Sequence, residues 1–155
     1  MARCCRSAIL ACAGVSRSGP ETFQAKLDTA SEVPAPSVGS ATPSGTATFT
    51  NNGTSIAYKL TATGLSSAFT AAHIHAGAAG ASGPVVVPLN LTAGPSGGTA
   101  GGEGSIDASA IKGKNADGSP MALNDLLAAM RSRGTYVNVH TANNKPGEVR
   151  GQILP

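Results

Sequence analysis

The sequence predicts a mainly β protein, built as one antiparallel β-sandwich with a single short helix. Its 155 residues suffice for one hydrophobic core but not for two. The composition, with 20 Gly, 10 Pro and only 12% charged residues, is typical of short strands joined by turns. Short runs of alternating apolar and polar residues, separated by turn residues, indicate sandwich or barrel strands.

The start of the chain predicts a leader. Arg3 and Arg6 give it a positive charge, residues 7–15 form a short apolar run, and residues 11–13 read Ala-Cys-Ala, a cleavage pattern. We therefore expect export. An untargeted N-terminal segment is the alternative.

This leader divides the chain into residues 1–18, a signal peptide or lipoprotein leader, and residues 19–155, the domain. Residues 9–12 resemble a lipobox, which would make Cys12 the site of a lipid anchor. We expect the protein to be secreted, periplasmic or on the cell surface. No other segment has the roughly 18 apolar residues of a transmembrane helix.

Without the leader, the domain is neutral and lacks cysteine. Three of the 11 Lys and Arg lie in residues 1–18, which leaves 8 basic residues against 8 acidic ones. A neutral domain without a basic, aromatic-interleaved stripe is not expected to bind nucleic acid. Because Cys4, Cys5 and Cys12 all precede residue 19, the domain has no disulfide, thiolate ligand or cysteine nucleophile.

Alternation predicts strands along most of the domain. Asn52-Gly53 between two such runs predicts a hairpin whose turn has positive φ at both residues. Residues 93–104 are rich in glycine and predict a connection. The predicted strands lie within residues 22–28, 45–50, 55–62, 68–76, 85–89, 135–142 and 147–154, and the hairpin places in one core Ala47, Phe49, Ile56, Tyr58 and Leu60.

One helix is predicted near residues 120–132. Ser119 is the expected N-cap, Pro120 the first helical residue and Gly134 the stop. Spacings of i, i+3, i+4 and i+7 give one apolar stripe, which indicates packing against the core: Leu123, Leu126, Leu127 and Met130.

The three histidines carry the most informative pattern. Residues two apart on a strand share a face, so His73 and His75 point away from the core if Ile74 enters it. His140 points away likewise if its valine neighbours enter the core. Three imidazoles from nearby strands can bind one ion at about 2.0–2.1 Å, and neutral nitrogen donors suit copper or zinc.

The alternative is a polar network of the histidines with Asn138 and Glu148, without a metal ion. If a metal is bound, Glu148 and Arg150 alternate to one face of the last strand and are candidates to hold the ligands. Glu32, within a proline-rich turn, is either a further such group or an ordinary loop carboxylate.

Several segments resemble the CHRD (chordin) domain family. They are FQAKLDTASEVPAP, the hairpin of residues 45–60, AAHIHAG with GPVVVPL, and YVNVHTANNKPGEVRGQIL, and together they span residues 22–154. The resemblance implies an immunoglobulin-like β-sandwich, found widely in bacterial exported proteins. It implies no established biochemical activity.

A looser resemblance is to the superoxide dismutase-like sandwiches of the copper–zinc enzymes, through the H-x-H strand, the later Val-His strand and the final Gly-rich strand. That resemblance implies His73, His75 and His140 as copper ligands. The chain departs from it because it has no bridging histidine, no zinc-loop histidines and no disulfide. The channel arginine also has no secure counterpart, although Lys145 or Arg150 could lie nearby.

These patterns predict an extracytoplasmic protein with a three-histidine site for one metal ion, copper rather than zinc, used in binding, storage or delivery. A copper redox enzyme of the superoxide dismutase type is the first alternative. The second is an interaction or structural module that binds an extracellular protein or polysaccharide and no metal. Metal content separates the first two from the third.

Overall fold

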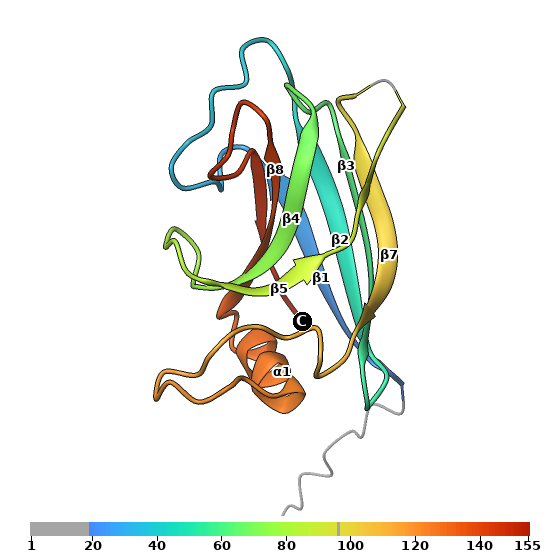
Figure 1. The fold of residues 1–155 in the computed structure, drawn as a ribbon, viewed down its shortest axis with the longest axis vertical. Helices are drawn as coiled ribbons and strands as arrows, with labels where there is room; N and C mark the ends of the chain where they lie inside the picture. The colour runs from blue at the N-terminus through green and yellow to red at the C-terminus, as the bar shows by residue number, and fades with distance from the viewer. Residues whose placement is uncertain (1–18, 96) are drawn as a thin grey trace, which may run out of the picture.

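The computed structural model describes residues 19–95 and 97–155, so the predicted leader, its cleavage pattern and Cys12 lie outside the described residues. The described residues form a mainly β domain with one short helix, as predicted (Figure 1). Its elements are β1 (Glu21–Asp28), β2 (Ser44–Asn51), β3 (Ile56–Thr63), β4 (Phe69–Ala76), β5 (Val85–Leu89), β6 (Thr92–Ala93), β7 (Ala100–Ile106), α1 (Leu123–Arg131), β8 (Thr135–Thr141) and β9 (Val149–Gln152).

The strands form one curled sheet in the order β5-β4-β8-β9-β1-β2-β3-β7-β6, and every pairing is antiparallel. The two halves of the sheet meet where β9 pairs with β1. Within these two strands, Asp28 and Arg150 form the single pair in the register. In Figure 1 the half with β4 and β8 lies across from the half with β1, β2, β3 and β7, and α1 closes one end. The core therefore lies inside the curl.

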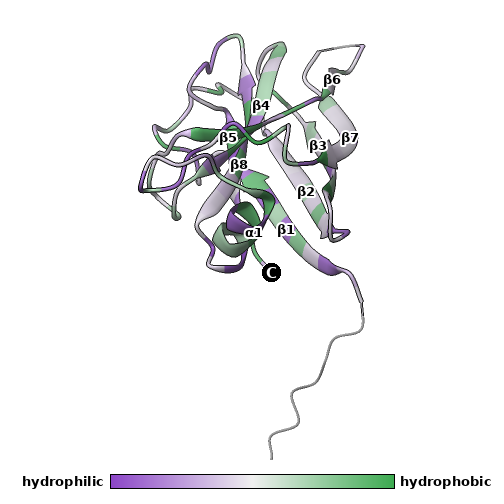
Figure 2. Ribbon diagram, turned by 60° about the horizontal axis from the view of Figure 1, so that its bottom comes forward, coloured by the Kyte–Doolittle hydropathy of each residue, from purple (hydrophilic) through white to green (hydrophobic). Residues whose placement is uncertain are grey.

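Strict alternation along the strands fills this core. In β1, Phe23, Ala25 and Leu27 are buried while the residues between them are exposed. β3 repeats the pattern, and Figure 2 shows apolar and polar bands alternating along β1. All five hairpin residues predicted for the core are buried. Apolar burial at about 25 cal/mol per Å² is the main force that selects this register.

The β2–β3 hairpin differs in its turn from the prediction. Among its turn residues only Gly53 has a positive φ, of 91°, whereas Asn52 does not. The turn lies one residue later than predicted, because the amide of Asn52 donates to the carbonyl of Ser55 at 2.9 Å and leaves Gly53 and Thr54 between them. The Asn51 side chain accepts from the Gly53 amide at 2.8 Å and completes the turn.

The glycine-rich segment is a strand for half its length, which corrects the predicted connection. β7 pairs with β3 from Ala100 to Ile106. Glycine fits at these positions because neighbouring atoms lie where a larger residue would have its side chain. A Cβ on Gly104 would lie 2.8 Å from the ring of Tyr58, the residue opposite it. Glycine therefore serves close packing here rather than flexibility.

The helix begins three residues later than predicted. Its N-cap is Ala122, whose amide donates to the Asp125 carboxylate at 2.9 Å. Ser119 instead bonds to Asp117, and Pro120 forms an isolated β-bridge with Lys114. The stop near Gly134 is confirmed, since its amide donates to the carbonyl of Ala129 at 2.8 Å.

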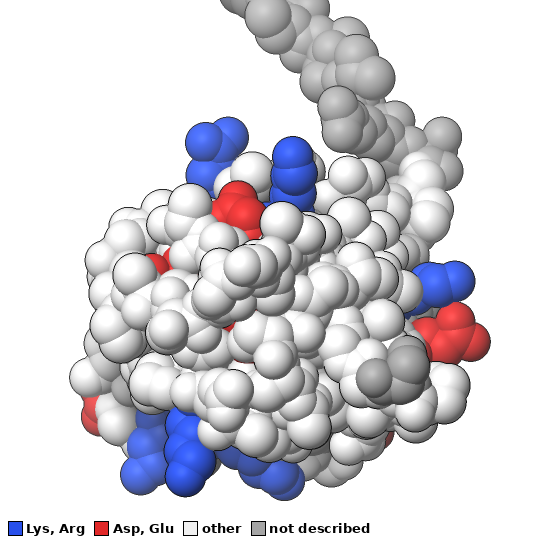
Figure 3. Space-filling model, turned by 90° about the horizontal axis from the view of Figure 1, so that it is seen from above, with Lys and Arg blue, Asp and Glu red and all other residues white. Residues whose placement is uncertain are grey.

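The predicted apolar stripe of α1 packs on the core, with Leu126, Leu127 and Met130 buried. The last two strands, β8 and β9, are each shorter than their predicted runs. Viewed from above, Lys and Arg lie at the rim of a largely uncharged end (Figure 3).

Candidate metal centre

Adjacent strands bring the three histidines together. His73 and His75 lie on β4 and His140 lies on β8, its antiparallel neighbour. The register pairs Ala71 with His140, His73 with Asn138 and His75 with Tyr136. Ile74, Val137 and Val139 are fully buried on the core side, so alternation turns the histidines to the opposite face. That face is covered by loops, and His75 and His140 are only 8% and 9% exposed.

The three rings surround a common space. One nitrogen from each lies within 4.8 Å of the other two. Nitrogens bound to one ion at about 2.0–2.1 Å in tetrahedral geometry lie roughly 3.3 Å apart. The His73 Nδ1 and His140 Nε2 atoms, 3.0 Å apart, already approach that spacing. The separations to the third nitrogen, which are at most 4.8 Å, would have to shorten for all three rings to bind one ion.

Backbone carbonyls fix the tautomers of two rings. His75 Nδ1 lies 2.8 Å from the carbonyl oxygen of Gly83, and His140 Nδ1 lies 2.8 Å from that of Lys145. A carbonyl only accepts, so each Nδ1 carries the proton and each Nε2 has a free lone pair. Metal-ligating histidines are commonly held by such bonds. His75 Nε2 is buried and has no hydrogen-bond partner.

His73 is the exception among the three histidines. In the described part of the chain no carbonyl accepts from its ring, and it is only half-buried. Because His140 Nε2 has the lone pair, His73 Nδ1 is the donor in their 3.0 Å hydrogen bond. A metal ion bound by these two atoms would replace this hydrogen bond.

Burial keeps the rings neutral. It lowers the pKa of His73 to about 4, with further contributions from His140 and His75. Burial also lowers the pKa of His75 and of His140, although the carbonyls of Gly83 and Lys145 oppose it. Neutral imidazole is the form that binds metal, so the site is prepared for an ion near neutral pH.

Tyr136 and Arg150 lie behind the His75 ring. The Tyr136 ring stacks on His75 with centroids 4.9 Å apart and an interplanar angle of 11°. The Arg150 Cζ atom lies 3.4 Å from the centroid of Tyr136. Arg150 is 1% exposed and its Nη2 donates to the carbonyls of Ala78 and Ala81, both at 2.9 Å. It is therefore fixed by stacking and by the loop after β4.

Glu32 and Asn138 lie together on this face. A Cβ added to Gly147 would meet both the Glu32 carboxyl and, at 2.8 Å, the Asn138 Nδ2 atom. Burial raises the pKa of Glu32, against the opposing effect of Arg150. Glu32 Oε2, Asn138 Oδ1 and Arg150 Nη1 are buried without a hydrogen-bond partner. Of these residues, Asn138 and Arg150 lie close enough to His75 to affect its pKa, which Asn138 raises and Arg150 lowers.

Glu148 acts on the site through a loop. Its buried carboxylate accepts hydrogen bonds of 2.6–2.8 Å from Ser66, Thr141 and Asn144, and from none of the histidines. Burial alone would raise its pKa, but these hydrogen bonds outweigh burial and lower it. The bonds anchor the β8–β9 loop, whose Lys145 carbonyl holds His140. Glu148 and Arg150, predicted to share a role, hold different loops.

Comparison with known families decides the assignment of the chain. A family model for the CHRD domain matches residues 23–153, which is nearly the whole sequence. This chain belongs to the CHRD domain family. Searches of curated proteins and of solved structures gave no significant match. Among residues 19–95 and 97–155, no helix of this CHRD domain has the length and apolar character needed to cross a membrane.

Some features of the CHRD site could not be read from its sequence. Backbone carbonyls of Gly83 and Lys145 give no residue-type signal. The stacking of Tyr136 on His75 depends on the register between β4 and β8, which the sequence does not provide. That Tyr136 shares a face with Asn138 was predictable from the alternation along the strand. Of the two residues named as possible counterparts of a channel arginine, Arg150 is buried, whereas Lys145 is exposed and lies beside the site, where its carbonyl accepts from His140.

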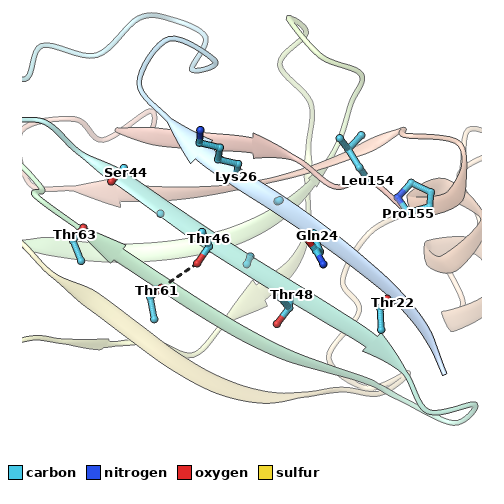
Figure 4. A pocket seen from close by; sticks show the side chains of 13 residues that line it. Thr22, Gln24, Lys26, Ser44, Thr46, Thr48, Thr61, Thr63, Leu154 and Pro155 are labelled. Atoms are coloured by element: carbon cyan, nitrogen blue, oxygen red, sulfur yellow. Dashed lines mark hydrogen bonds between the residues drawn. The ribbon is translucent and has the colours of Figure 1, made fainter. Parts of the chain in front are cut away.

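A second feature of the CHRD domain is a shallow depression of about 730 Å³ on the outer face of β1, β2 and β3. Figure 4 shows threonine side chains from all three strands along it, with Thr46 bonded to Thr61 at 3.3 Å. Its lining has hydroxyls, one lysine and the C-terminal Leu154 and Pro155, but no aromatic ring. None of the three histidines lines it.

Proposed function

We propose that this CHRD domain binds one copper ion through His73, His75 and His140, outside the cytoplasm, for metal binding, storage or delivery. The observation that carries the proposal is the pair of carbonyl hydrogen bonds on His75 and His140. They leave each Nε2 atom with a free lone pair, and one nitrogen from each of the three rings lies within 4.8 Å of the other two. His75 Nε2, buried and without a hydrogen-bond partner among the described residues, is available to bind a metal ion.

The ligand atoms of the site favour copper over zinc. All three are imidazole nitrogens, and intrinsic affinity for such donors rises to copper in the divalent series. Zinc remains the metal to compare, because three histidines also form zinc sites with one open position. The metal-free reading, an interaction module for an extracellular protein or polysaccharide, becomes the conclusion if neither ion binds.

A copper redox enzyme is the second candidate function. Three protein ligands would leave a coordination position open, and the partial exposure of His73 supports access of a small molecule to the ion. Against turnover of a charged substrate stands the buried Arg150, whose guanidinium is held by two carbonyls. Assays with superoxide and peroxide on the copper-loaded protein distinguish an enzyme from a binding protein.

The deciding experiment is metal analysis of the protein produced without a His tag. We expect one copper ion per chain after exposure to equal copper and zinc, followed by removal of weakly bound metal. The His73→Ala/His140→Ala double variant is the control, because only His75 then remains. Equal metal content in both proteins would reject the metal site.

Export is proposed from the leader pattern and from membership of the CHRD family. N-terminal sequencing of native protein should find residues 1–11 absent, with the first residue near Gly14 or at a lipid-modified Cys12. Recovery of an intact chain beginning at Met1 from the cytoplasm would reject export.

A further inference from the structure

The three rings of the candidate copper site have neutral hydrogen-bond partners. Their hydrogen bonds in the described part of the chain go to the carbonyls of Gly83 and Lys145 and to one another. Within residues 19–95 and 97–155, no carboxylate is hydrogen-bonded to any of the three. The four acceptor bonds of Glu148 all come from other residues. A bound ion would therefore keep its full charge.

The charged group stacked behind the site is a cation. Arg150 lies against Tyr136, and Tyr136 lies against His75. β8, which carries Tyr136, lies between β4 and β9 in the sheet. An arginine is always protonated, and this one is 1% exposed, so water screens its charge little.

Such a cation discriminates between oxidation states. Cupric copper has one more positive charge than cuprous copper and is repelled more strongly. Two unit charges about 8 Å apart, at an effective dielectric constant of about 20, change a binding constant by roughly tenfold or more.

The coordination also favours the lower oxidation state. Divalent copper prefers tetragonal sites with four or more donors. The described residues offer three, and two of these rings are less than a tenth exposed, so added ligands can approach only beside His73. Monovalent copper has a filled d shell and accepts three neutral nitrogens without a fourth ligand.

We propose, as an extension of the copper-binding function, that this site selects cuprous copper and that Arg150 sets the selectivity through its charge. Glu32, which is 4% exposed, is a buried acidic group whose charge interacts with that of Arg150. It partly offsets the cation. Removing the acid should therefore act in the direction opposite to removing Arg150.

The test measures two dissociation constants for the full, tag-free chain. Anaerobic competition with a cuprous chelator gives one, and competition with a cupric chelator gives the other. We expect tighter binding of cuprous copper. Arg150→Gln should reduce the preference about tenfold, equivalent to about 59 mV in potential, whereas Glu32→Gln should increase it. Lys59→Gln, which removes an exposed charge on β3, is the matched control and should leave it unchanged.

The outcomes separate this inference from the copper-binding proposal. If neither ion binds better than to the His73→Ala/His140→Ala variant, both fail. If copper binds but cupric ion is held as tightly as cuprous ion, only the selectivity fails. If Arg150→Gln does not fold, Glu32→Gln decides the role of Arg150, and an unchanged or reduced preference in that variant would reject it.

Discussion

His73 Nδ1 lies 3.0 Å from His140 Nε2, across two neighbouring strands and 67 residues of sequence. The carbonyl of Lys145 fixes the His140 tautomer, so His73 is the donor. Copper bound between them would move the His73 proton to its Nε2 atom rather than release it. The pair is thus preformed for an ion while its hydrogen bond satisfies both nitrogens in the metal-free protein.

This relationship predicts little proton release on metal binding. Burial lowers the pKa of all three histidines, that of His73 to about 4, so all are neutral at pH 7. Calorimetric titrations with copper at pH 7 should give the same enthalpy in buffers of different ionisation enthalpy, after correction for metal–buffer binding. Release of a full proton would contradict the tautomer assignment.

Ligand removal should weaken copper binding without unfolding the domain. We expect His140→Ala to weaken it at least about 100-fold, since it removes a ligand and not only its support. His73→Ala should weaken it by a similar factor but speed copper loss more, because His73 is the more exposed ligand. Chelator competition and stopped-flow transfer measure the two effects, with Lys59→Gln as control. Equal affinity in wild type and variants would reject these ligands.

Acid should destabilise the domain through the histidines. A pKa lowered in the folded state means that the unfolded chain binds more protons below about 6.5. Stability should therefore fall as pH drops from about 6.5 towards about 4. Urea unfolding at several pH values checks this, and the double histidine variant should have a shallower slope over this interval. The same pKa shifts should extend copper retention below pH 6.5, the ordinary pKa of histidine, because the protons that compete for the ring nitrogens bind less readily.

Glu148→Gln should reduce the free energy of unfolding by about 2–4 kcal/mol. The amide would present N–H groups to Ser66, Thr141 or Asn144, which now donate to the carboxylate. Copper affinity should also fall, because the loop that carries the Lys145 carbonyl loses its anchor. Glu103→Gln, an exposed acid on β7, is the control for denaturant unfolding. Equal free energies of unfolding for Glu148→Gln and Glu103→Gln would contradict the anchoring of the loop by Glu148.

Gly147→Ala should destabilise the domain by about 1–3 kcal/mol. Gly147 has a φ of 141°, and its added Cβ would meet the Glu32 carboxyl and the Asn138 amide. Thermal unfolding is the measurement. Gly19→Ala, with no atom near its Cβ, should leave the melting temperature unchanged. An unchanged melting temperature for Gly147→Ala would show that the surrounding side chains move to accommodate the added methyl group without loss of stability.

The oxidised, copper-loaded protein should lack an intense blue band. Residues 19–155 contain no cysteine, so no thiolate can bind copper there. Electron paramagnetic resonance of the cupric form should give an axial signal with nitrogen hyperfine structure. A spectrum without nitrogen coupling would exclude histidine ligation.

Local sequence determined much of the fold. Alternation in β1 and β3 fixed which side chains enter the core, since a strand has only two faces. The sequence pattern gave a wrong prediction where packing between strands decides the structure. Gly104 was predicted to lie in a connection, yet it lies in a strand, and the ring of Tyr58 opposite occupies the space of a side chain there. The helix α1 also begins later than predicted. The Asp117 carboxylate accepts a hydrogen bond from Ser119, the predicted N-cap, and the Asp125 carboxylate caps the helix instead.

For the site, the sequence by itself determined that His73 and His75 share a face and that His140 lies on the polar side of its own strand. Period-two alternation carries that information within each strand. Only the tertiary structure decided that β4 and β8 are neighbours, which brings the third imidazole within 4.8 Å. It also supplied the carbonyls of Gly83 and Lys145 and the buried Arg150. Strand pairing and backbone acceptors depend on the path of the whole chain, because every residue type has the same carbonyl and side-chain alternation does not specify a strand's neighbour.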